Sequence, residues 1–322
     1  MKRKQIFYTL VMAAGLLTAC GTDDERIPAE PQTQSAADGG QAPADLTRHI
    51  SVEVSERPMA EEGTAEGRSL ATRTAITTTE TLGNFTMKGV YDGSQYDYSV
   101  EKSAGTGKWT VKPDTWPLSD PSYDNTKVQF YAYTDGTFYP NNGTPFIDFT
   151  VAEDAFNQHD LLVATNSVAF NDHSGTVPLI FDHACAALAF NIFMSNTLSG
   201  KLGGNTLTVT GIVLKNVCKK GKYNFGTTFN ESTWRDVSGS ANYTLLNSSS
   251  MVITTTPEPL SSDYLFMIPQ ERAADGTDGT YLEISYTFSG QERTTATIPL
   301  TVNWKKSTQY TINIKLGTTL IK

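Results

Sequence analysis

Apolar and polar residues alternate in the stretch Phe85-Thr86-Met87-Lys88-Gly89-Val90-Tyr91, and again in Tyr96-Asp97-Tyr98-Ser99-Val100-Glu101. Successive side chains of a β-strand point to opposite faces of the sheet, so this pattern is typical of strands that bury one face. The small residues of Ser103-Ala104-Gly105-Thr106-Gly107 then lead into Lys108-Trp109-Thr110-Val111, which predicts a hairpin. This part of the chain is therefore expected to be antiparallel β-structure.

Short strands of the same kind recur along the rest of the chain, with Gly, Asn and Asp turns between them, which is typical of antiparallel sandwiches. No stretch after the first twenty residues keeps a helical apolar period over three turns. We therefore predict an all-β protein with two sandwich domains, residues 48–175 and 176–322, divided near the turn at 172–176. The further predicted strands are 128–133, 146–151, 161–164, 177–181, 188–193, 207–214, 223–225, 251–254, 264–268, 281–288, 294–300 and 310–316.

Composition excludes several classes of protein. The 322 residues suffice for about two domains. Charged residues make up 18% and hydrophobic residues 39%, which is too apolar for a disordered chain and too polar for a polytopic membrane protein. With 25 Lys and Arg against 34 Asp and Glu, the net charge is −9, and no basic cluster is present. Phosphate binding needs clustered cations, so no nucleic acid partner is expected.

The chain begins with a targeting segment. Lys2, Arg3 and Lys4 precede an apolar stretch, residues 6–17, which is too short to cross a bilayer because about 20 residues are needed. It ends in Leu17-Thr18-Ala19-Cys20, which resembles the lipobox of bacterial lipoproteins. The resemblance implies that residues 1–19 are a signal peptide and that Cys20 is lipidated. An ordinary secretory signal with an incidental cysteine is the alternative.

The acidic run Asp23-Asp24-Glu25 follows directly and resembles the surface-export signal of lipoproteins in Bacteroides-like bacteria. A solvated tether is the alternative interpretation. Residues 26–44 consist largely of Pro, Gln, Ala, Gly and Asp and contain only one large apolar residue, Ile27. Such a segment cannot bury enough surface to offset its ordering entropy. Residues 20–47 are therefore predicted to be a flexible acidic tether.

A lone strand follows the tether. Ile50, Val52 and Val54 alternate with polar residues and predict a strand over residues 49–55. Residues 56–73 are then acidic, contain Gly and Pro and show no periodicity, so we expect an exposed loop. A strand cut off from the main body by such a loop is unusual.

The sequence signals no catalytic, metal or cofactor site. The four histidines lack the spacing of a metal motif, and the nucleophile elbow, the phosphate-binding loop and the dinucleotide fingerprint are all missing. His159-Asp160 and Asp182-His183 are adjacent pairs, and neighbours on a strand point to opposite faces, so neither is expected to be part of a catalytic triad. A pair of carboxylates for glycoside hydrolysis stays open, because its spacing is a tertiary property.

Two further features allow two interpretations each. Cys185 and Cys218 could form a bridge in an oxidising periplasm, but the apolar surroundings of Cys185 favour unpaired thiols. A set of aromatic residues could form a glycan-binding platform, although such residues are more often core or cross-strand pairs. These aromatic residues are Tyr96, Tyr98, Trp109 and Trp116.

Several segments together resemble the fimbrillin family, the type V pilin-like (Mfa-like) lipoproteins of Bacteroides-like bacteria. The strongest likeness is Val177-Pro178-Leu179-Ile180-Phe181-Asp182-His183-Ala184, running on to Leu188-Ala189-Phe190. Ala186-Ala187 departs from the family, where a basic or polar residue often follows the histidine stretch. The other segments are the lipobox, Thr72-Arg73-Thr74-Ala75-Ile76-Thr77, Asp160-Leu161-Leu162-Val163-Ala164, and Asn303-Trp304-Lys305 with Gln309-Tyr310-Thr311-Ile312-Asn313-Ile314.

The resemblance implies two tandem transthyretin-like sandwiches and a role in cell-surface fimbriae. In the family, a lipidated precursor reaches the outer membrane and a trypsin-like protease cuts after an arginine. An N-terminal strand then leaves and a strand from another subunit takes its place. Carried over to this chain, the cut falls after Arg73, with Arg68 as second choice, and Ile50, Val52 and Val54 fill the groove beforehand. The partners are other fimbrial subunits and the outer membrane, with a host protein or glycan as a further ligand.

Two other functions compete with the fimbrial one. A surface lipoprotein could bind glycan or host protein without polymerising, and a β-rich enzyme could act on surface polysaccharide. The sequence does not separate stalk, tip and anchor subunits. Either the strand 310–316 swings out as a donor, or the subunit accepts strands without donating one.

Overall fold

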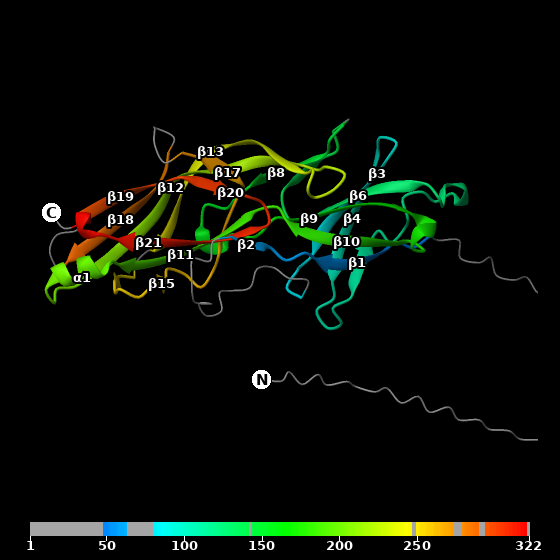
Figure 1. Ribbon diagram of the computed structural model, residues 1–322. Helices are drawn as coiled ribbons and strands as arrows, with labels where there is room; N and C mark the ends of the chain where they lie inside the picture. The colour runs from blue at the N-terminus through cyan, green and yellow to red at the C-terminus, as the bar shows by residue number, and fades with distance from the viewer. Residues whose placement is uncertain are drawn as a thin grey trace, which may run out of the picture. The chain divides into compact units, whose positions relative to one another are not determined.

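The computed structural model describes residues 48–62, 80–141, 143–246, 249–273, 279–289 and 294–320. These residues belong to one unit, Thr47–Lys322. The predicted all-β class is confirmed, since strands dominate the described ranges (Figure 1). The other regular elements described are helix α1 (Asn196–Leu202) and the 3-10 turns η1 (Pro121–Tyr123), η2 (Ala155–Asn157), η3 (Phe170–Asp172) and η4 (Thr318–Leu320).

The first sheet contains the alternating stretches that decide the fold class. β1 runs parallel to its neighbour β10, and the other strands of the sheet pair antiparallel. In strand β3, Phe85 and Met87 are buried, as the alternation predicts. The strand order is β1 (Ser51–Glu56), β10 (Thr176–His183), β9 (Leu162–Ala169), β6 (Lys127–Tyr133), β3 (Phe85–Tyr91), β4 (Ser94–Lys102) and β5 (Trp109–Lys112).

A second sheet has the last long strand of the chain in its interior. Its order is β15 (Glu258–Pro259), β11 (Ala186–Met194), β21 (Thr308–Leu316) and β2 (Ala60–Glu62), with β16 (Leu265–Met267) also pairing with β11. β21 runs parallel to both β11 and β2.

The third sheet is built around the longest described strand, β12 (Leu207–Asn224). Its order is β19 (Thr294–Leu300), β18 (Thr280–Phe288), β12, β8 (Phe146–Thr150) and β7 (Thr137–Tyr139), and β12 also pairs with β13 (Thr233–Leu246) and β14 (Met251–Val252). A separate pair is formed by β17 (Gln270–Arg272) and β20 (Val302–Trp304).

The buried apolar side chains fall into two clusters. The first cluster is formed mainly by the first sheet and includes Met87, Phe130 and Phe181. The second, larger cluster includes side chains from β8, β11, β12, β18 and β21. Burial of apolar area in such clusters is the main favourable term in folding.

The four aromatic residues considered as a glycan platform belong to the first cluster. Tyr98 and Trp116 are buried in it, and Tyr96 and Trp109 pack against it half-buried. Their rings therefore contribute to the core, and the platform interpretation is wrong for this set.

Strand pairing connects the two sides of the predicted division at residue 175. β10 lies after this point but belongs to the first sheet, whereas β7 and β8 lie before it and join the sheet of β12. The division into domains 48–175 and 176–322 stays a prediction. The predicted signal peptide, 1–19, and the tether, 20–47, lie outside the described residues, as do residues 63–73 of the predicted loop. Residues 56–62 are described and contain the end of β1, the buried Met59 and strand β2, so the prediction of an exposed loop is wrong for them. Among the described helices, none is long and apolar enough to span a membrane.

Candidate functional site

Strand β1 forms the edge of the first sheet, beside β10 (Figure 1). Its register with β10 runs from Ser51 opposite Thr176 to Glu56 opposite Phe181. The segment is also held on its other side, because the Ile50 N–H donates to the Asp114 carbonyl at 2.8 Å. β1 thus occupies a gap between β10 and the residues that follow β5.

The inner face of β1 is apolar over three positions. Ile50 is buried in the first apolar cluster, and Val52 and Val54 pack against it half-buried. The intervening residues Ser51, Glu53 and Ser55 are exposed. The three residues predicted to fill a groove therefore lie along one face of a sheet-edge strand, while their removal during assembly stays a prediction.

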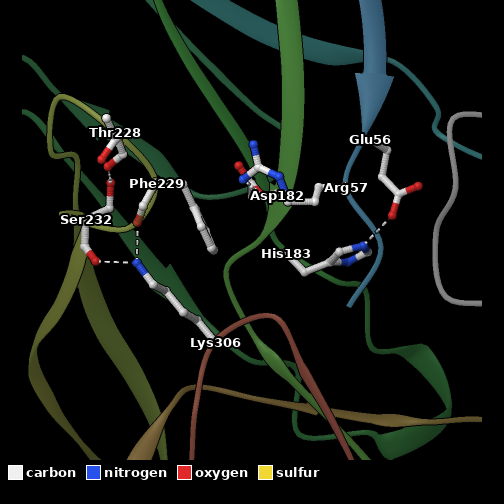
Figure 2. A network of polar contacts seen from close by, with 8 residues as sticks. All are labelled: Glu56, Arg57, Asp182, His183, Thr228, Phe229, Ser232 and Lys306. Atoms are coloured by element: carbon white, nitrogen blue, oxygen red, sulfur yellow. Dashed lines mark hydrogen bonds and ion pairs between the residues drawn. The ribbon is translucent and has the colours of Figure 1, made fainter. Parts of the chain in front are cut away.

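The fourth inward position of β1 is charged. Glu56 follows Val54 on the same face, and its Oε1 accepts a hydrogen bond from Nε2 of His183 at 2.8 Å (Figure 2). Nδ1 of His183 donates to the Asp160 carboxylate. The side chains of His183 and Asp160 are 0% exposed, and that of Glu56 is 12% exposed. A buried imidazole ring is thus held between two carboxylates, one from strand β1 and one from the segment just before β9.

The next residue, Arg57, forms a second ion pair with the body of the protein. Its Nη1 donates to Oδ1 of Asp182 at 2.5 Å; the Asp182 side chain is 6% exposed and that of Arg57 is 54% exposed. Lys306 lies on the other side of the site (Figure 2), and its Nζ donates to the carbonyls of Phe229 and Ser232. We call Glu56, Arg57, Asp160, Asp182 and His183 the charge cluster.

Burial and the ion pairs change the pKa values in the charge cluster. Burial by itself lowers the pKa of His183, but its hydrogen bonds with Asp160 and Glu56 outweigh burial and raise that pKa above its ordinary value of 6.5. Burial raises the pKa of Asp160, and the hydrogen bond from His183 opposes this only in part. Burial also raises the pKa of Asp182 against the opposing charge of Arg57. Asp160, Asp182 and His183 therefore retain their protons to higher pH than the same groups would in water.

This arrangement does not suit catalysis. A general base needs a free nitrogen and access to substrate, but both ring nitrogens of His183 are bonded to carboxylates and the ring is fully buried. Cys185 and Cys218 are free and buried, and burial raises the pKa of the Cys185 thiol well above its ordinary value. Within the described ranges, no group of three or more His, Cys, Asp or Glu residues could hold a metal ion.

The chain after β1 continues to a second sheet. Met59 is buried, and β2 runs parallel to β21 with Ala60 opposite Thr308. The Ala60 N–H donates to the Ser307 carbonyl at 2.9 Å. Residues 48–62, which we call the N-terminal segment, therefore cover the edge of β10 in the first sheet and the edge of β21 in the second (Figure 1).

The other residues predicted from sequence lie outside the described residues. They are the lipidation site Cys20, the export residues Asp23, Asp24 and Glu25, and the processing sites Arg68 and Arg73. Sequence reasoning missed the charge cluster. A signal was present in the acid–base pair Glu56-Arg57, which comes directly after the apolar alternation of Ile50, Val52 and Val54.

A model of the fimbrillin-like family matches residues 65–322. The chain belongs to the fimbrillin-like family. A solved structure of a fimbrial protein from Bacteroides vulgatus has the same fold, with a TM-score of 0.54 and 18% identity over 84% of this chain and 95% of that one. No curated protein sequence matches the chain.

Two more solved structures are candidate cell adhesion proteins. One, from Bacteroides uniformis, has a TM-score of 0.46 and 14% identity over 84% of this chain and 93% of that one. The other, from Bacteroides eggerthii, has a TM-score of 0.47 and 12% identity over 84% and 87% of the two chains.

Proposed function

We propose that this fimbrillin-like chain is a structural or adhesive subunit of cell-surface fimbriae. It reaches the outer membrane as a lipoprotein anchored through Cys20, with Asp23, Asp24 and Glu25 directing export to the surface. Proteolysis after Arg73 or Arg68 then frees the N-terminal segment, and a strand of another subunit replaces it. The family match supports a structural role rather than an enzymatic one.

The observation that carries this proposal is the place of the N-terminal segment on two sheet edges. An open edge beside an apolar groove is a template for a strand from another chain. β1 covers the edge of β10, and β2 covers the edge of β21. Loss of one segment would thus open an acceptor site on β10 and free one side of β21, the strand considered as a donor.

The apolar contacts of β1 suit a strand that stays in place until it is cut. Full burial of a Val or Ile side chain stabilises by about 1.5–3 kcal/mol, so one buried and two half-buried residues contribute roughly 3–6 kcal/mol. Here Ile50 is buried and Val52 and Val54 are half-buried. Spontaneous release is rare as long as the segment is tethered to its own site. After a cut, a donor strand competes by mass action.

Limited trypsin treatment tests the assembly mechanism. Wild-type protein should give ladders that resist mild SDS on a cold gel, whereas Arg68→Ala combined with Arg73→Ala should stay monomeric. Arg235→Ala is the matched control, because Arg235 is an exposed arginine on β13, away from the N-terminal segment. Equal ladders from the double variant and wild type would rule out these processing sites. If trypsin yields no ladder from any of the proteins, a surface lipoprotein that binds glycan or host protein without polymerising becomes the better proposal.

Lipidation at Cys20 has a separate test. Cys20→Ala should abolish incorporation of labelled fatty acid, because the cysteine sulfur is the atom that would carry the diacylglyceryl group. Neutral replacement of Asp23, Asp24 and Glu25 should leave labelling intact while reducing digestion of the protein on whole cells by added protease. Unchanged labelling of the Cys20 variant would contradict the anchor.

A further inference from the structure

The charge cluster consists of two parts that separate when the N-terminal segment leaves. Glu56 and Arg57 leave with the segment, whereas Asp160, Asp182 and His183 belong to the body of the protein. The body then retains a buried imidazole donor and a nearly buried carboxylate at the end of the groove. Both groups need new partners from whichever strand enters next.

The strand position that bonds the His183 side chain demands an acceptor that is also an anion. A buried donor left without a partner costs its desolvation free energy, and hydrogen bonds between charged groups are stronger than neutral ones. Asp160 already occupies Nδ1 of His183, so Nε2 is the atom that the incoming strand must satisfy. An apolar side chain here would bury the N–H unpaired, and an amide would accept the bond without a charge.

The next position demands a cation. Asp182 is almost fully buried, and its partner Arg57 reaches it from the solvent side. Lys306 donates to the carbonyls of Phe229 and Ser232 (Figure 2) and acts on Asp182 only through its charge, without a hydrogen bond to it. A cleft of about 290 Å³, lined by Arg57, Asp182, Ile180 and Ser232 among others, leaves room for a long basic side chain.

The two positions also fix the register of the entering strand. A slip of one residue moves every side chain of a strand to the opposite face. It would place Ser55 or Arg57 on the inner face, where Glu56 now contacts His183. A slip of two residues keeps the same side chains on the inner face, so a strand with only apolar inward residues does not resist it. In a strand with one inward acid, the same slip moves the acid away from His183.

We propose that the end of the β1 groove is a recognition site for an acid–base pair on the incoming strand. The partner is a strand of a second fimbrial subunit with three alternating apolar residues, then an inward acidic residue that bonds Nε2 of His183, then directly a basic residue that pairs with Asp182. This inference rests on the proposed strand exchange. It adds a chemical rule for which strands are accepted and in which register.

Peptide exchange tests the rule, first with the wild-type protein. The full chain is treated with trypsin, the protease is inhibited, and a fluorescent peptide with the sequence of residues 48–59 is added. Matched peptides carry Glu56→Gln, Arg57→Gln or Glu53→Gln. The last one is the control, because Glu53 lies on β1 but faces solvent and the substitution removes the same charge. Peptide incorporation is followed by fluorescence anisotropy and by gel filtration.

The expected order of apparent affinity is wild type equal to Glu53→Gln, then Arg57→Gln, then Glu56→Gln. Loss of a buried charged hydrogen bond predicts a decrease of about tenfold or more for Glu56→Gln. The discrimination between the wild-type and Glu56→Gln peptides should disappear when the protein carries His183→Gln. If all four peptides bind the wild-type protein equally, the groove accepts strands but the acid–base rule is wrong. If the wild-type peptide does not bind, strand exchange itself is wrong and the rule falls with it.

Discussion

β1 and β21 are both candidates to move during assembly, yet different interactions hold them. β1 is an edge strand with one long partner, β10, and its inner face ends in the charge cluster. β21 lies between β11 and β2 and pairs with β11 from Ala186–Thr308 to Met194–Leu316. Its Ile314 and Leu316 are buried in the second apolar cluster.

The difference favours β1 over β21 as the strand that would leave in the proposed assembly. Release of β1 exposes one buried and two half-buried apolar side chains and separates two ion pairs. Release of β21 would break a long parallel ladder and open a large core. Charges can be re-paired by a new strand that carries the same groups, whereas a core strand can be replaced only by one of matching shape. β1 is therefore the better candidate for exchange in the proposed assembly. β2 covers β21 only from Thr308 to Tyr310, so its departure would expose that part of the edge.

The largest expected effect comes from removing the centre of the charge cluster. His183→Ala leaves Asp160 and Glu56 without their common partner, and breaking a buried ion pair in this way costs about 3–5 kcal/mol. His173→Ala is the control, since His173 is exposed. Urea unfolding measures the free energy, and hydrogen exchange should show the β1 amides losing protection before those of β21. Equal stability of the two variants would mean that the cluster does not hold β1.

The second prediction compares one apolar residue from each strand. Leu316→Ala should destabilise the protein by about 2–5 kcal/mol, because it leaves a cavity in the larger core. Val54→Ala should cost only about 1 kcal/mol, because Val54 is half-buried at a sheet edge. Urea midpoints of the two variants check this. A larger loss for Val54→Ala would reverse the comparison and make β1 the more firmly packed strand.

The strands themselves could be predicted because alternation is a local signal. The expected strand at 85–91 coincides with β3, and 310–316 lies within β21. β13 was missed because its first half is mostly exposed and contains Ser and Gly, so no alternation stands out. Helix α1 was missed because it is shorter than three turns, although Ser195 caps its start and Gly203 takes a left-handed conformation at its end.

The charge cluster could not be predicted in the same way. His183 contacts Asp160, which is 23 residues away, and Glu56, which is 127 residues away. The alternation rule correctly separates the neighbours Asp182 and His183 onto different faces, but it is silent on neighbouring strands. Only the sheet order β1-β10-β9 brings the three groups together.

The third prediction concerns pH. The pKa of His183 is raised above 6.5 and that of Asp160 above 3.8 in the folded protein. A group whose pKa is raised by folding contributes stability below its unfolded pKa, and this contribution is lost as pH rises through the folded pKa. The unfolding free energy should therefore fall as pH rises above 6.5, by about 1.4 kcal/mol for each unit by which the pKa of His183 is raised. Asp160 and Glu56 are the charged groups that bond the ring, and Asp182 on the other face of the strand interacts with it through charge alone.

Urea unfolding at a series of pH values between about 6 and 9 checks this dependence. His183→Gln should remove most of the slope in that range, because it removes the imidazole whose pKa is raised by folding. Leu316→Ala should lower the free energy at all pH values and leave the slope unchanged. The same slope in wild type and His183→Gln would assign the pH dependence to other groups.

The smallest effect is expected from the exposed end of the cluster. Arg57→Gln removes the partner of Asp182, but the arginine side chain is more than half exposed, so solvent screens much of the pair. The expected loss is about 1 kcal/mol, and it should be smaller at high salt because screening weakens the attraction that is removed. Lys112→Gln is a suitable control, because Lys112 forms an ion pair with Glu101 in which both side chains are exposed. Its loss should change the unfolding free energy very little. Urea unfolding at low and high salt measures both variants. If Arg57→Gln lowers the unfolding free energy no more than Lys112→Gln does, the burial of Asp182 does not strengthen its ion pair with Arg57. The bond between Glu56 and His183 is then the one charged interaction of the cluster by which the end of β1 differs from β21.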